Sequence, residues 1–114
     1  MFTELLASGS GGGELEFTIL ASDSGGAVFK KSDLSKFEIK IDNIQSASYP
    51  LILKASNSLA LASNRISSWT TVKTYNSTTS TFEDVLPLLS SYEYFGFYTG
   101  AGSQNAVITA KMTM

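Results

Sequence analysis

The sequence contains neither cysteine nor histidine, and these two absences exclude much of the chemistry that small domains perform. Without cysteine there is no disulfide, thiol nucleophile or thiolate ligand, and without histidine there is no imidazole base or zinc ligand. The fold must therefore be held by side-chain packing and backbone hydrogen bonds. A chain without thiols suits either redox environment, so this absence does not indicate a compartment.

Charge is also scarce, because only 16% of the 114 residues are Asp, Glu, Lys or Arg and the net charge is −2. The basic residues are scattered, which gives no electrostatic reason to bind nucleic acid or an anionic membrane. No apolar run approaches the roughly 18 residues of a transmembrane helix. The N-terminus lacks the basic region and long apolar core of a signal peptide. We therefore expect one soluble domain with no nucleic-acid partner and no membrane partner.

The chain does have a series of short segments in which apolar and polar residues alternate. Such alternation predicts strands that bury one face, and turns rich in Gly, Ser and Asn separate them. The predicted strands are 14–21, 27–30, 37–44, 51–55, 69–75, 92–99 and 106–114. Segment 59–62 is compatible with helix or strand, and its spacing slightly favours strand. The pattern predicts an all-β fold, an antiparallel β-sandwich or jelly roll, with Trp69 in or near the core. Segments 14–21 and 27–30 are expected to form a hairpin.

The aromatic residues concentrate in segment 92–99, which reads as a strand with two different faces. One face carries Tyr92, Tyr94, Gly96 and Tyr98, and the other carries Glu93, Phe95 and Phe97. The phenylalanine face suffices for the domain's own core. The tyrosine face is either covered by segment 82–89 or spare, with Gly96 leaving a notch for another backbone or a sugar ring. Segment 82–91 as a whole is expected to be a short helix or an irregular crossover that fills one end of the core.

No group of residues in the sequence has the pattern of a catalytic, cofactor or metal site. Glu14 and Glu16 share a strand face and, with Glu38, indicate a solvated edge rather than a glycosidase pair. Asp23 lies in a turn that offers too few oxygen ligands for calcium. Glu93 is expected at the exposed end of its strand, rather than buried against a lysine such as Lys73 or Lys111. The sequence therefore predicts a protein that is not an enzyme and needs no cofactor.

Residues 1–13 join an apolar tip to a Gly/Ser tether. The tip carries Phe2, Leu5 and Leu6, and the glycines that follow favour a flexible connection. Two interpretations remain open: a frayed terminus, or an arm that docks into a neighbouring subunit. The predicted domain division is an arm and tether at 1–13 followed by a single sandwich domain at 14–114.

Three parts of the chain resemble small β-domains of bacteriophage and prophage tail modules. These parts are the strand WTTVKTY at 69–75 with its Thr/Ser loop, the strand YEYFGFY at 92–98 with its Gly/Ser loop, and the opening MFTELLA with its tether. The resemblance implies a structural virion component, namely a tail-tip, fibre or decoration subunit. Such a protein is made in the host cytoplasm and leaves the cell inside the particle.

The resemblance also implies the kind of partner, but it carries over no site residues, because no invariant motif is matched. In a virion the partners are other virion subunits, copies of the same chain included, so a homo-oligomer is expected. The strand pair is similar to galactose-binding-like jelly rolls as well, and the alternative function is therefore a carbohydrate-binding module for a cell-surface glycan. The interface or glycan candidates are Phe2, Leu5, Leu6, Tyr92, Tyr94 and Tyr98.

Overall fold

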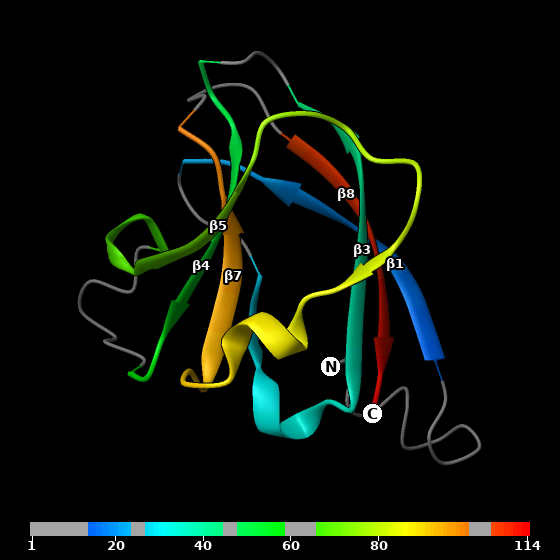
Figure 1. Cartoon of the computed structure of the whole chain (residues 1–114), viewed down its shortest axis with the longest axis vertical. Coiled ribbons are helices and arrows are strands. Elements are labelled where there is room, and N and C mark those ends of the chain that lie inside the picture. Colours follow the sequence, from blue (N-terminus) through cyan, green and yellow to red (C-terminus); the bar gives the residue numbers. More distant parts are fainter. Residues whose placement is uncertain (1–13, 24–26, 45–47, 59–65, 101–105) are drawn as a thin grey trace.

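The computed structural model describes residues 14–23, 27–44, 48–58, 66–100 and 106–114 (Figure 1). These residues form two antiparallel sheets of four strands, with three short 3-10 helices and no α-helix. The first sheet has the order β1 (Glu14–Ala21), β8 (Ala106–Thr113), β3 (Lys36–Asn43) and β6 (Glu83–Asp84). The second has the order β2 (Val28–Lys30), β7 (Tyr94–Tyr98), β4 (Leu51–Ser56) and β5 (Thr70–Tyr75). The predicted all-β antiparallel sandwich is confirmed.

The strands pair in a nested order. The first pairs with the last, the second with the seventh, the third with the sixth and the fourth with the fifth. Pairing of β3 with β8 and of β4 with β7 then joins these pairs into the two sheets. The hairpin predicted for 14–21 and 27–30 is wrong, because β1 and β2 belong to different sheets. Their Phe17 and Phe29 rings face each other instead, with centroids 6.1 Å apart.

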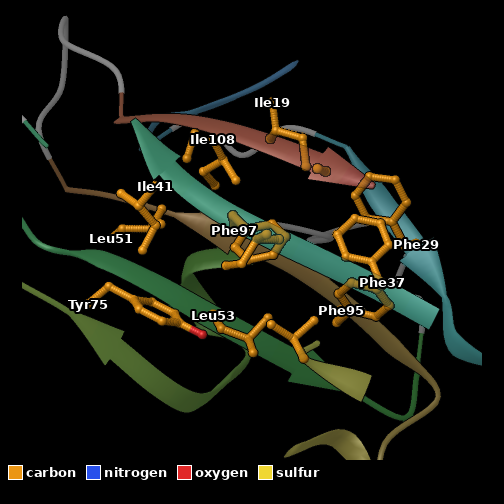
Figure 2. Close-up of a cluster of buried hydrophobic side chains, with 14 of the residues drawn as sticks. Ile19, Phe29, Phe37, Ile41, Leu51, Leu53, Tyr75, Phe95, Phe97 and Ile108 are labelled. Atoms are coloured by element: carbon orange, nitrogen blue, oxygen red, sulfur yellow. The ribbon is translucent and has the colours of Figure 1, made fainter. Parts of the chain in front are cut away.

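The inward faces of the strands meet in one hydrophobic cluster, in which Phe37 is fully buried (Figure 2). Its ring lies 4.8 Å from that of Phe29 and 5.0 Å from that of Phe95. The alternation read from 14–21, 37–44 and 106–114 places the buried side chains correctly. Phe95 and Phe97 are buried as well, so the predicted phenylalanine face does belong to the core.

The short 3-10 helices lie in connections between strands. They are η1 (Lys31–Asp33), η3 (Ile66–Ser68) and η4 (Leu86–Leu89). Val85 and Leu89 are fully buried in the main cluster, so segment 82–91 is the irregular crossover that fills part of the core. The predicted strand at 59–62 lies outside the described residues. No helix among the described residues is long and apolar enough to cross a membrane.

A polar cluster bridges the two sheets on the side where β5 and β6 are the last strands. Lys73 Nζ lies 2.9 Å from Glu83 Oε2, and the Tyr75 hydroxyl donates to Glu83 Oε1 at 3.1 Å. The Lys73 ammonium also lies 5.0 Å from the centroid of the Tyr75 ring. Burial, reinforced by the Glu83 carboxylate, raises the pKa of Tyr75 well above its ordinary value of 10.0. The folded protein therefore holds the Tyr75 proton more tightly than the unfolded chain does.

We expect this tyrosine to make the protein sensitive to alkali. Above about pH 10 the unfolded chain releases the Tyr75 proton while the folded protein keeps it, so the free energy of unfolding falls as pH rises, by up to about 1.4 kcal/mol per pH unit. Tyr75→Phe removes this group and should give a shallower dependence in urea unfolding. Tyr49→Phe, a control that keeps Tyr75, should keep the wild-type slope. Equal slopes for wild type and Tyr75→Phe would contradict the assignment.

Candidate functional site

The outward face of the second sheet carries the candidate tyrosines. Ile52 stands opposite Tyr98, and Ser56 stands opposite Tyr94. Directly opposite residues in an antiparallel pair project to the same side, so these four side chains share the face that points away from the core. Tyr94 and Tyr98 are both partly exposed there. For the residues of β7, the predicted division into a tyrosine face and a phenylalanine face agrees with the structure.

The notch predicted at Gly96 is not open. A Cβ atom at this glycine would lie 2.7 Å from Ile66 Cδ1 and 3.1 Å from the Ala27 carbonyl oxygen. Ile66, in η3, is only 1% exposed, so it occupies the space that the missing side chain leaves. The expectation that segment 82–89 covers this face is therefore wrong at Gly96, where Ile66 lies instead. A partner on the tyrosines beside it stays a prediction. An apolar side chain needs cover, and a glycine lets it approach the backbone closely.

Lys54 holds residues 66–69, the covering segment, against the sheet. It stands opposite Gly96 on the outward face, yet it is only 9% exposed. Its ammonium donates to Ser67 O at 3.3 Å, to Trp69 O at 3.4 Å and to Thr71 Oγ1 at 3.0 Å. It also lies 5.6 Å from the centroid of the Tyr98 ring. Three acceptors and an aromatic face replace the water that a buried ammonium loses.

Trp69 is buried, as predicted, but the main core does not contain it. Trp69 is 8% exposed, and it and Ile66 both lie outside the main hydrophobic cluster. Its backbone N–H donates to Ile66 O at 3.0 Å, which closes the turn of η3. Ile66 and Trp69 are therefore buried outside the main cluster, at the two ends of one turn, and Ile66 lies against the outward face at Gly96.

This covering segment divides the exposed aromatic surface. At one end Tyr98 has its hydroxyl near Gly100, and the ring of Tyr49 lies near the same glycine. Tyr49 is 45% exposed, which makes it one of the most exposed large apolar side chains described. At the other end Tyr94 stands between Ser56 and Lys30. Sequence reasoning missed Tyr49, because it precedes Pro50 outside any alternating segment.

The remaining sequence candidates lie elsewhere. Tyr92 precedes β7 and packs, partly buried, against the core cluster rather than on the outward face. Glu93 is partly exposed at the start of β7, where it accepts from Ser32 Oγ at 2.7 Å. Its backbone N–H donates to Asn57 Oδ1. Glu93 therefore lies at the exposed end of the strand, as expected. Phe2, Leu5 and Leu6 lie outside the described residues.

Lys73 and Lys111, the two lysines considered as partners of Glu93, have other neighbours. Lys73 pairs with Glu83, and the Lys111 ammonium lies 4.3 Å from the centroid of the Phe82 ring. Lys111 stands between Glu16 and Glu38 in one row across the outward face of the first sheet. This row is therefore charged, as the solvated-edge interpretation of Glu14, Glu16 and Glu38 expects.

Comparisons with protein-family models, curated proteins and solved structures find no match to this chain. Among the described residues, no group of three or more acidic, His or Cys side chains is placed to hold a metal ion. The chain's own surfaces are therefore what indicates a function. What they offer is a partly exposed aromatic face on a sheet that packing and the Lys54 hydrogen bonds hold in place.

We expect Gly96→Ala to disturb this face, because its methyl group must displace Ile66. The cost should be about 1–3 kcal/mol in chemical unfolding, with a shift in the fluorescence of Trp69, the single tryptophan. Ile66→Ala makes room, so the double variant should be less destabilised than the sum of the two changes. Gly100→Ala, where a Cβ meets nothing closer than 3.6 Å, is the matched control and should change little. Strict additivity would show that the two residues do not share this space.

Proposed function

We propose that this protein is a non-enzymatic structural subunit of a bacteriophage virion, of the tail-tip, fibre or decoration kind. It acts through protein–protein assembly with other subunits of the particle. The proposal is carried by the nested strand order, in which strands paired from the two ends of the chain alternate between facing sheets. This is the order of an eight-stranded jelly roll, an architecture that serves viral capsid and lectin domains. It supports the finer description of the sandwich as a jelly roll.

The outward face of the second sheet supports a protein partner over a sugar. A sugar site wants adjacent exposed aromatics with polar groups beside them. Here Ile66 interrupts the face at Gly96 and separates Tyr94 from Tyr98. The end that holds Tyr98, Ile52 and Tyr49 instead combines aromatic and aliphatic surface with little charge. Tyrosine-rich surface of this kind is enriched in protein interfaces.

The N-terminal segment would give the subunit a second contact. Phe2, Leu5 and Leu6 precede a tether of glycine and serine, an arrangement that suits an arm docking into a neighbouring subunit. The tether ends at Glu14, where β1 begins. The arm remains a prediction from the sequence.

Changing Tyr94 and Tyr98 together to Ser tests the aromatic face. The protein should stay folded, because both side chains lie outside the main cluster, with a lower melting temperature because the Tyr98 ring beside the Lys54 ammonium is lost. It should no longer appear in particles collected after lysis of cells that encode it, as measured by peptide mass spectrometry. Changing the same two residues to Phe keeps both rings and should preserve incorporation. Unchanged incorporation of the Ser variant would contradict the proposed interface, and loss of glycan-array binding alone would favour the carbohydrate-binding module.

Removal of residues 1–13 tests the arm. The shortened protein should give the circular dichroism of a folded β protein but fail to enter particles. Changing Phe2, Leu5 and Leu6 to Ser in the full chain should have the same effect, because the apolar tip makes the contact. Normal incorporation of both variants would show that this segment is only a frayed terminus.

A further inference from the structure

Each sheet ends in strands whose outer backbone groups can pair with another strand, and proteins usually protect such edges. Three of the four edge strands here carry a protective feature. β2 has three residues and β6 has two, so both are short. β5 is longer, but its register with β4 shifts between Leu53 and Lys54. It also carries Lys73 opposite the buried Leu53, which places a charge on the inner side.

β1 has none of these features. It is eight residues long and runs in unbroken register with β8, from Glu14 opposite Thr113 to Ala21 opposite Ala106. It contains no Pro, no Gly and no lysine. Within the described part of the chain it pairs with β8 alone. Leu20, on its outward face, is 54% exposed, more than any other large apolar side chain described.

We propose that β1 pairs edge to edge with β1 of a second copy of this chain. The two strands run antiparallel across a two-fold axis, so that the first sheets of both copies form one continuous sheet. Two identical strands can satisfy each other's free backbone groups in this way, and a two-fold axis closes the assembly as a dimer. A second copy of β1 offers an edge of the same eight-residue length and the same unbroken register. Its acidic end can also lie beside the uncharged end of the first copy, so the partner is a second copy.

The placement of charge along β1 selects this arrangement. On the outward face Glu14 and Glu16 lie at one end, and Thr18 and Leu20 lie at the other. An axis at Phe17 puts Glu14 opposite Leu20 of the second copy, and an axis at Thr18 puts Glu16 opposite Leu20. In both registers no carboxylate faces a carboxylate. Parallel pairing in register, or antiparallel pairing centred on the acidic end, would place like charges directly opposite each other.

The pairing goes beyond the proposed function and does not depend on it. The aromatic face lies on the second sheet, whereas β1 is an edge of the first. The Tyr94/Tyr98 variant therefore leaves β1 intact, and substitutions in β1 leave both tyrosines intact. A dimer without particle incorporation would overturn the virion proposal alone, and incorporation of a chain that stays monomeric in solution would overturn the β1 pairing alone.

Two substitutions at Leu20 test the pairing in the full-length protein. In either register Leu20 faces a glutamate of the second copy, so Leu20→Glu creates a repulsive pair and Leu20→Lys an attractive pair. Sedimentation velocity at low salt should show a dimer for wild type and for Leu20→Lys. Leu20→Glu should raise the dissociation constant of the dimer about tenfold or more, because the two-fold axis repeats the repulsive pair on both sides. This difference should shrink at high salt.

Equal melting temperatures would show that both variants fold, since Leu20 is exposed and its neighbour in β8 is Val107. Equal weakening by Glu and Lys would overturn the proposed register, because a contact that only buries Leu20 does not distinguish the two charges. A wild-type protein that stays monomeric at all concentrations would overturn the pairing itself.

A single engineered cysteine gives an independent measurement, because the natural chain has none. Thr18→Cys lies on the axis in one register, where directly opposite side chains are close enough for a disulfide. In the other register the two cysteines are diagonal neighbours, about 7–8 Å apart and within reach of a short bifunctional maleimide. Thr74→Cys, on the protected β5 edge, should give no crosslinked dimer. Failure of Thr18→Cys to crosslink by either route would contradict the pairing.

Discussion

The contact of Phe37 with the aromatic rings of the opposite sheet is the interaction on which the rest of the structure depends. Phe37 comes from β3 in the first sheet, and its ring meets those of Phe29 and Phe95 in the second, as Figure 2 shows. With no disulfide in the chain, the facing of the two sheets rests on this packing. Phe95 is also the neighbour of Tyr94 and Gly96 in β7. The same ring that anchors the core therefore fixes which side chains of β7 face outward.

Strand positions could be predicted from the sequence, and strand partners could not. Alternation is a local signal, so the limits of β1, β3 and β8 agree with the predicted segments within about two residues. The turn after β1 suits a hairpin and also suits a crossing between sheets, so it does not decide the pairing. The apolar faces decide it, because the rings of Phe17 and Phe29 meet when β1 and β2 face each other across the core.

The candidate site shows the same limit. Alternation correctly gave β7 two faces, but the filling of the space at Gly96 depends on Ile66, a residue far away in the sequence. Lys54 is buried because residues 66–69 fold over it and offer carbonyl oxygens, a contact that nothing in the run LILKA at 51–55 indicates. A glycine between tyrosines is compatible with an open notch or with close approach of the chain itself. Only the tertiary contacts distinguish these two possibilities.

The nested pairing also has a consequence for the time course of folding. Among the described residues β1 pairs with β8, which follows it by most of the sandwich, so β1 leaves the ribosome well before its partner. Contacts between residues so far apart in the sequence form slowly, because the ends of a long loop must first be brought together. During synthesis β1 therefore has both of its edges open, at a stage when nascent chains on neighbouring ribosomes lie close by. The acidic residues at the start of β1 then slow aggregation, because parallel, in-register pairing of β1 strands from two unfinished chains would place like charges opposite each other.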